Sequence, residues 1–412
     1  MSASGSALPP FPFDLPAVPR ISRCSAEEMD RRKYDGPVII TGCLEQSDLY
    51  KGLRGAVSTT DKLRHLTELF GSESIAFSRL PPSERGQFGY REDGSANFLD
   101  TGAPGSTGSD GRVRFAEFAE RLLPAISDSE SDVLYMQAHP VPEGSPLDQA
   151  APPLPYLQRW TPPSRQIWIG SGRQVVNLHR DFSFNLISMY EGTKRVALFP
   201  PHALGDLYPS PLHKLVGSTE GSLVRLLSFD REKFPRIERL MGQGQLAVLN
   251  AGDVLYIPPR WWHHVESFGL NVMINSFIPD LDMEMHSRMI ANFYQAMGLF
   301  ADLPPLMRSA YGLLYRRQAF SVGQSHVGPE LMEDEDPSTY VPNLRTLAGI
   351  SEHLISTLVL YRSLPPYWCD HAANMFDYYV FRLAGDPFPT LPRGEYRRML
   401  CSIEPILRQL VA

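Results

Sequence analysis

Apolar residues between positions 166 and 278 fall into short runs that are separated by Gly, Pro, Asn and Asp. The runs are QIWIG, VVNLH, FNLISMY, RVALFPP, QLAVLNAG, DVLYIPP and NVMINSFI. Runs of this length between turn residues are typical of β-strands. Many short strands in succession indicate an all-β sandwich or barrel rather than alternating βαβ units.

Helical spacing of apolar residues replaces this pattern after Asp280. The segments that show it are MHSRMIANFYQAMGLFADL, MRSAYGLLYRR, LRTLAGISEHLISTLVLYRSL, ANMFDYYVFRLAG and YRRMLCSIEPILRQLV. An acidic stretch that contains proline, at residues 328–343, divides them and is interpreted as a linker. We therefore predict a packed helical domain at residues 280–412.

The part of the chain before the β-rich region mixes both patterns. GPVIITG, at residues 36–42, is a β-branched run bounded by Gly and Pro, and it predicts a buried strand. Residues 60–70 and 115–123 have the apolar spacing of helices. Residues 102–111 are a Gly/Ser/Asp loop and residues 140–163 a proline-rich connection, each of them either the rim of a functional site or a surface spacer.

Length and composition set the domain organisation. A chain of 412 residues can build a large core and a second folded unit. The first residues are rich in Pro, Ser and Ala, so residues 1–24 are expected to form an extended arm without helix or strand pairing. A main domain follows at residues 25–279, with its β core at 166–279, and precedes the helical domain.

Charge, cysteine content and hydropathy exclude several classes of protein. The net charge of −7 is spread along the chain without a Lys/Arg-rich stripe, which argues against nucleic-acid binding. The four cysteines contain no CxxC pair, so neither a disulfide framework nor a zinc knuckle is predicted. No signal-peptide pattern and no apolar run near the roughly 18 residues of a membrane span is present. We expect a soluble, cytoplasmic protein that binds neither nucleic acid nor membranes.

A His-x-Asp pair in the segment VVNLHRDFSFN is the first candidate for chemistry. His179 and Asp181 point to the same face if the segment is a strand, because side chains alternate between the faces of a strand. Imidazole and carboxylate would then converge on a point where a metal ion could bind. Alone, the pair is a weak signal, since a histidine beside a solvated aspartate is common.

A second segment, AGDVLYIPPRWWHHVESF, strengthens the metal hypothesis. One of its adjacent histidines, His263 or His264, could return beside the first pair in a barrel of antiparallel strands. Two histidines and one carboxylate leave a face of an octahedral Fe(II) open for a chelating co-substrate and O₂. The pair His264 and Glu266 is a rival that the spacing leaves open. A motif at residues 369–371, Cys-Asp-His, is less favoured because it lies in a helical context.

Lys194 is a cation at the start of the apolar run RVALFPP. An ammonium group inside a barrel requires an anionic partner such as a ligand carboxylate, whereas at a strand end it can reach water. The amides of Asn185 and Asn275 lie on neighbouring strand candidates and could donate hydrogen bonds to the same ligand.

The motifs HRDFSFNL, GTKRVALFPP, AGDVLYIPPRWWHHVES and VMINSF, in this order, resemble the cupin-like branch of the JmjC hydroxylases, the group that includes factor inhibiting HIF. The strong match covers residues 166–279, with weaker similarity in GPVIITG, in the helix at 115–123 and in DVLYMQ. The resemblance implies a mainly β fold with α: a double-stranded β-helix (cupin or jelly-roll) barrel, flanked by N-terminal helices. Residues 25–279 would then be the catalytic domain.

The resemblance also implies a set of site residues. It gives Fe(II) as the metal, 2-oxoglutarate and O₂ as co-substrates, and His179, Asp181 and His263 as the catalytic iron ligands. The residues that it assigns to 2-oxoglutarate are Lys194, for the C5 carboxylate, with Tyr135, Asn185 and Asn275. Val176 departs from the pattern, because several relatives have a Thr there that also binds the co-substrate.

The leading hypothesis is an oxygenase that hydroxylates an amino-acid side chain in a protein or peptide. The same chemistry on a small molecule, such as a free amino acid or a natural-product intermediate, is the nearest alternative, because the fold supports both. A non-catalytic cupin that binds a metal or ligand is a third. By the same resemblance, the C-terminal helices are expected to form a homodimer, or alternatively one wall of the substrate site.

Overall fold

The computed structural model describes residues 8–32, 35–88, 112–154, 164–210, 219–279, 283–301, 311–312, 315, 319, 344–362, 364 and 366–376. The chain divides into two compact units, Met1–Asp280 and Leu281–Ala412. No helix among the described residues is both long and apolar enough to cross a bilayer.

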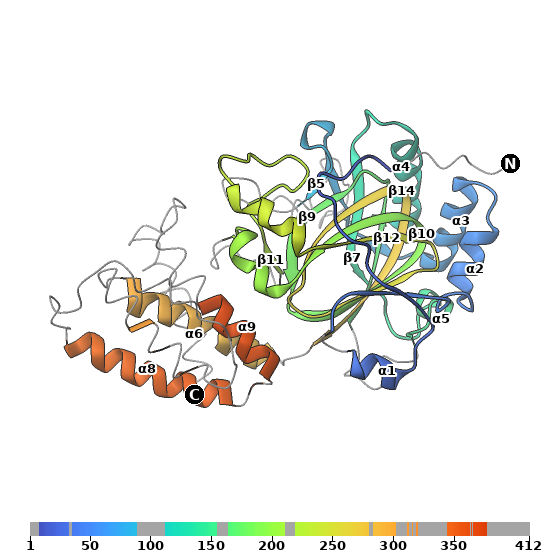
Figure 1. The fold of residues 1–412 in the computed structure, drawn as a ribbon. Helices are drawn as coiled ribbons and strands as arrows, with labels where there is room; N and C mark the ends of the chain where they lie inside the picture. Colours follow the sequence, from blue (N-terminus) through green and yellow to red (C-terminus); the bar gives the residue numbers. More distant parts are fainter. Residues whose placement is uncertain are drawn as a thin grey trace. The chain divides into compact units, whose positions relative to one another are not determined.

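Twelve strands of the N-terminal unit form one sheet that curves into a barrel (Figure 1). They are β1 (Arg20–Ser22), β2 (Val38–Thr41), β4 (Ser78–Leu80), β5 (Gln87–Phe88), β7 (Val133–Pro140), β8 (Ser164–Gly170), β9 (Val175–Asp181), β10 (Ser183–Phe199), β11 (Thr219–Gly221), β12 (Gln245–Asn250), β13 (Val254–Ile257) and β14 (Trp262–Pro279). The main path runs β1-β2-β13-β10-β14-β8-β7-β4; β9 pairs with β14, β11 and β5, and β12 pairs with β10. Strands β3 (Ser74–Ile75) and β6 (Val113–Arg114) form a separate pair.

Strands β10 and β14 are each one long strand, where the sequence predicted two shorter segments for β10 and only the second half of β14. They pair antiparallel from Ser183–Pro279 to Phe199–Trp262, with register shifts on both sides of Glu191. Gly192 lies at the shift with φ +81°, and a Cβ there would come within 2.2 Å of the Leu270 carbonyl oxygen. Because both strands bend at this point, each contributes to both walls of the barrel. This arrangement is the predicted double-stranded β-helix.

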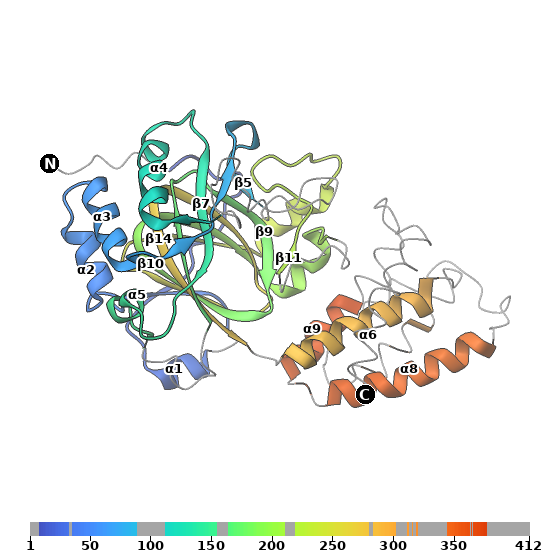
Figure 2. The ribbon, with the colours of Figure 1, turned by 180° about the vertical axis from the view of Figure 1, so that it is seen from behind.

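Helices cover the outside of the barrel on one flank (Figures 1 and 2). In the N-terminal unit they are α1 (Ala26–Arg31), α2 (Asp48–Gly55), α3 (Thr59–Phe70), α4 (Phe115–Ser127) and α5 (Pro146–Ala150). Ser58 and Asp61 form a capping box that starts α3. Phe70 of α3 stacks on Phe115 of α4 with ring centroids 4.0 Å apart, inside the core between helices and sheet.

The predicted helices at 60–70 and 115–123 and the strand at 36–42 are confirmed, and α4 continues to Ser127. Helices α1 and α2 were not predicted. Helix α2 is short and contains glycine, although Leu49 and Leu53 give it one apolar face. The proline-rich connection is interrupted by α5, which the sequence did not predict. The loop at 102–111 lies outside the described residues.

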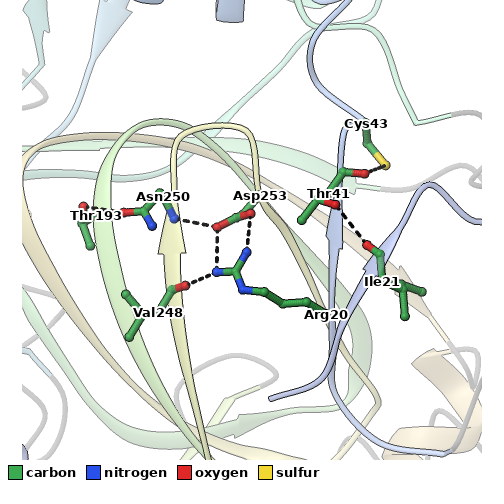
Figure 3. A network of polar contacts seen from close by, with 8 residues as sticks. All are labelled: Arg20, Ile21, Thr41, Cys43, Thr193, Val248, Asn250 and Asp253. Atoms are coloured by element: carbon green, nitrogen blue, oxygen red, sulfur yellow. Dashed lines mark hydrogen bonds and ion pairs between the residues drawn. The ribbon is translucent and has the colours of Figure 1, made fainter. Parts of the chain in front are cut away.

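The prediction of an arm without strand pairing is wrong for its second half. Ala17 bridges to Leu246, and β1 pairs in parallel with β2. Frequent prolines before β1 hide this pairing in the sequence, because proline removes a backbone donor but is tolerated on edge strands. Arg20 then anchors β1 by a two-point ion pair to Asp253, with distances of 2.9 and 3.1 Å (Figure 3). Asp253 also accepts a hydrogen bond of 2.8 Å from the Asn250 backbone N–H. This hydrogen bond stabilises the turn before β13.

The C-terminal unit contains α6 (Met283–Ala301), α8 (Leu344–Arg362) and α9 (Pro366–Phe376). A buried polar network joins two of them: the Asn292 amide donates to Thr357 Oγ1 at 2.6 Å, and the Tyr315 hydroxyl lies 2.5 Å from the same oxygen. The helices predicted at residues 285–303 and 344–364 are confirmed as α6 and α8. Helix α9 begins at Pro366, before the predicted start at residue 373, and most of the predicted helix at 307–317 lies outside the described residues. The linker at 328–343 and the last predicted helix lie outside the described residues.

Candidate metal centre

Three of the predicted ligands lie together at one end of the barrel. His179 and Asp181 end β9, and His263 begins β14 directly opposite His179 in the antiparallel pair. One ligand atom from each residue lies within 4.8 Å of the others. Nε2 of His263 is 3.6 Å from Asp181 Oδ2, and the two imidazole centroids are 4.1 Å apart. Two strands thus place two imidazoles and a carboxylate around one point, the donor set that suits Fe(II).

The backbone fixes how the two histidines face that point. Nδ1 of His179 lies 2.7 Å from the Asn177 carbonyl oxygen, and Nδ1 of His263 lies 3.1 Å from the Trp261 carbonyl oxygen. A carbonyl only accepts, so each Nδ1 carries the proton and each Nε2 keeps its lone pair for a metal. Burial, followed by the neighbouring His263, lowers the pKa of His179 to about 4 and keeps it in the neutral form that binds metal. The residues present therefore fit an Fe(II) ion.

The alternative pair, His264 and Glu266, lies on the face of β14 opposite to His263. His264 is buried on the opposite face of β14, where its ring lies 6.2 Å from that of Phe11. Glu266 is held by Arg195, with Nε donating to its carboxylate at 2.7 Å. Neither side chain joins the cluster around His263, so the geometry separates two neighbours that the sequence could not. The Cys-Asp-His motif lies on α9, and the side chains of its first two residues lie outside the described part.

Lys194 is buried inside the barrel, as the hypothesis of an anionic ligand requires. Its Nζ donates to Ser267 Oγ at 2.6 Å and lies 5.8 Å from the centre of the Tyr135 ring. Burial lowers the pKa of Lys194 to about 7. The sequence did not single out Ser267, although the pairing of Lys194 with this residue places both on one face.

The two predicted asparagines, Asn275 and Asn185, are linked to Asp181 by consecutive hydrogen bonds. Asn275 donates to Asn185 Oδ1 at 2.8 Å, and Asn185 donates to Asp181 Oδ2 at 3.2 Å. A carboxylate held by such a donor keeps its orientation when it binds a metal. The amide oxygen of Asn275 has no hydrogen-bond partner within the described part of the chain.

A cavity of about 440 Å³ opens beside these residues. The triad, Tyr135, Asn185 and Asn275 line it, so the structure brings all the predicted residues except Lys194 to its wall. Nζ of Lys194 lies 5.8 Å from the centre of the Tyr135 ring, which belongs to the cavity wall. Trp168 also lines the cavity, as do Gln137 and Ala138 in the bulge of β7 opposite it, and no pattern in the sequence predicted these three residues. Ala138 has φ +51°, a backbone conformation that only a folded strand register reveals.

Comparison with known proteins agrees with this architecture. The cupin-like domain family matches residues 26–280, more than half of the chain. The chain is 27% identical to lysine-specific demethylase JMJ31 of Arabidopsis thaliana over 258 residues, which cover 58% of this chain and 45% of that protein. It is 35% identical to human HSPB1-associated protein 1 over 114 residues, 27% of this chain and 23% of that protein.

JmjC domain-containing protein D of Dictyostelium discoideum is 36% identical over 107 residues, 26% of this chain and 23% of that protein. The chain thus spans less than half the length of these relatives. The names of the Arabidopsis and Dictyostelium relatives support the resemblance to JmjC proteins. Membership of the narrower branch that includes factor inhibiting HIF stays a prediction. The predicted cofactor set of Fe(II), 2-oxoglutarate and O₂ is that of JmjC oxygenases and is confirmed at the level of the family. By this match and by its barrel, the chain belongs to the cupin-like domain family.

Proposed function

We propose that this chain is an Fe(II)- and 2-oxoglutarate-dependent oxygenase that hydroxylates an amino-acid side chain in a protein or peptide. The observation that carries the proposal is the cluster of His179, Asp181 and His263 at a cavity whose wall residue Tyr135 lies 5.8 Å from the buried Lys194 Nζ. A metal site alone would serve many functions. A metal site with an anion-binding group behind it suits a dicarboxylate co-substrate.

Each group of the site has a defined task in this proposal. Fe(II), when bound, supplies the redox chemistry that couples conversion of 2-oxoglutarate and O₂ to succinate and CO₂ with hydroxylation of a substrate C–H bond. His179, Asp181 and His263 would hold the metal, and Asn185 orients the Asp181 carboxylate. The apolar walls of the cavity, which include Val176, Val265 and Met273, exclude water from the reacting groups.

A protein or peptide substrate is favoured by the relatives. The names of the two Arabidopsis relatives describe them as lysine-specific demethylases, so their substrates carry a lysine side chain. We infer from this that the present chain also acts on an amino-acid side chain, with its substrate entering the same cavity. The small-molecule alternative has no separate observation in its favour.

Succinate formation from 2-oxoglutarate in air with Fe(II) tests the proposal. We expect the wild type to form succinate. The rate should fall by at least about a hundredfold in Asp181→Ala and His263→Ala, because each substitution removes one ligand of the metal and weakens metal binding. His202→Ala, at an exposed position, is the matched control and should retain full activity. Equal turnover in all four proteins would refute the mechanism. Mass spectrometry of a peptide library should then find a product that has gained one oxygen atom.

A further inference from the structure

Trp168, a residue of the cavity wall, carries a buried hydrogen-bond donor. Its indole nitrogen Nε1 is buried, and no acceptor lies within hydrogen-bond distance of it among the residues that the structure describes. The side chain is part of the cavity wall. A buried N–H without an acceptor costs free energy, so such a group in a cavity marks a position where a ligand supplies the acceptor.

The position of Trp168 identifies which part of a ligand it can reach. In the pairing of β8 with β14, Gln166 lies opposite Asn275, and Trp168 lies one step further along the strand, opposite Met273. Asn275 is linked to Asp181 through Asn185. Trp168 is therefore displaced along the barrel from Asn275 by one inward-facing position.

Trp168 and Lys194 flank the same tyrosine. The ring centroid of Trp168 is 5.6 Å from that of Tyr135, and Nζ of Lys194 is 5.8 Å from that same centroid. Val176 packs against the same apolar cluster as Trp168. Trp168, Val176 and Tyr135 thus line this part of the cavity, and the cation of Lys194 lies against the ring of Tyr135.

We propose that the indole N–H of Trp168 donates a hydrogen bond to the distal (C5) carboxylate of 2-oxoglutarate, beside Lys194; this rests on the proposed function. An indole nitrogen can only donate, so its ligand must present an acceptor. An ionised carboxylate has about four acceptor positions, which Lys194 alone cannot satisfy. A neutral donor adds a charge-assisted hydrogen bond without adding a second buried charge.

Binding of 2-oxoglutarate to the full chain with Fe(II), in the absence of O₂ so that no turnover occurs, tests the proposal by calorimetry. Trp168→Phe keeps an aromatic ring and removes the N–H, and it should weaken the affinity about tenfold. The probe 2-oxobutyrate lacks the distal carboxylate, so wild type and Trp168→Phe should bind it equally. Trp262→Phe is the matched control, because its indole N–H is also buried without an acceptor in the described part but does not line the cavity.

A rescue variant makes the test more specific. Val176 lines the cavity in the same apolar cluster, and threonine has nearly the same shape as valine with a hydroxyl in place of one methyl. Val176→Thr in the Trp168→Phe background should restore most of the lost affinity for 2-oxoglutarate. It should leave the affinity for 2-oxobutyrate unchanged.

Nuclear magnetic resonance on the wild-type chain gives a readout that needs no substitution. With Zn(II) in place of iron, one of the five indole N–H signals should move to higher frequency on addition of 2-oxoglutarate and stay in place with 2-oxobutyrate. Unchanged 2-oxoglutarate affinity in Trp168→Phe, or equal weakening for both oxo acids, would overturn the inference while the proposed function stands. A wild-type chain that does not bind 2-oxoglutarate would overturn both.

Discussion

A lysine buried inside a barrel is the most informative single residue of the site, because its charge depends on its ligand. Burial lowers the pKa of Lys194 to about 7. A bound carboxylate favours the ammonium form and raises this pKa again. Above about pH 7 the protein without ligand therefore holds Lys194 increasingly neutral, and binding of 2-oxoglutarate must take up a proton.

We expect the affinity for 2-oxoglutarate to fall as the pH rises from 7 to 9, approaching about tenfold per pH unit. Calorimetry at pH 8 in two buffers of different ionisation enthalpy measures the proton uptake directly. Lys194→Arg is the control, because a guanidinium stays charged over this range and its binding should release or absorb no proton. Affinity that is constant from pH 6 to 9 would contradict a role for a titrating lysine.

At the scale of elements, the pairing of the N-terminal arm with the barrel depends on Asp253. Its side chain is 11% exposed and accepts from both Arg20 and the Asn250 backbone, so Asp253→Ala removes three hydrogen bonds at once. We expect a loss of about 2 kcal/mol in the free energy of unfolding. Tryptophan fluorescence in a urea titration measures it, since four of the five tryptophans lie in the N-terminal unit.

The matched control is the pair of Arg23 and Glu45, which also joins the ends of the first two strands. Its side chains are 60% and 58% exposed. Solvent screens such a pair, so Arg23→Ala should change the free energy of unfolding by less than about 0.5 kcal/mol. Equal effects of Asp253→Ala and Arg23→Ala would show that the buried network adds nothing to the attachment of the arm.

Sequence patterns predicted the residues that cluster at the candidate metal site better than they predicted the elements that carry them. Strand periodicity places His179 and Asp181 on one face, but it cannot choose between His263 and His264, because the choice depends on the register of β14 against β9. Turn residues such as Gly192 suggested separate strands where the chain bends within one. Trp168 and Ser267 were not predicted as site residues, because a single aromatic residue or serine on a strand forms no distinctive sequence pattern.

The helices of the second unit are expected, from the sequence, to join two copies of the chain in a homodimer. Helix α8 presents Ile355 and Val359 at 64% exposure each, and residues four apart lie on the same face of a helix. An exposed apolar pair costs little in a monomer and contributes to an interface when a second copy covers it.

We therefore expect light scattering after size exclusion to give twice the 46.2 kDa of the chain, and the chain mass for a double variant with Ile355→Glu and Val359→Glu. Two glutamates would have to lose their hydration in the interface, which costs several kcal/mol. Val57→Glu, at an exposed position of the N-terminal unit, is the matched control and should leave the dimer intact. A wild type that runs as a monomer would contradict the dimer. A double variant that stays dimeric would instead locate the interface on other residues, because buried unpaired carboxylates are incompatible with a stable contact at α8.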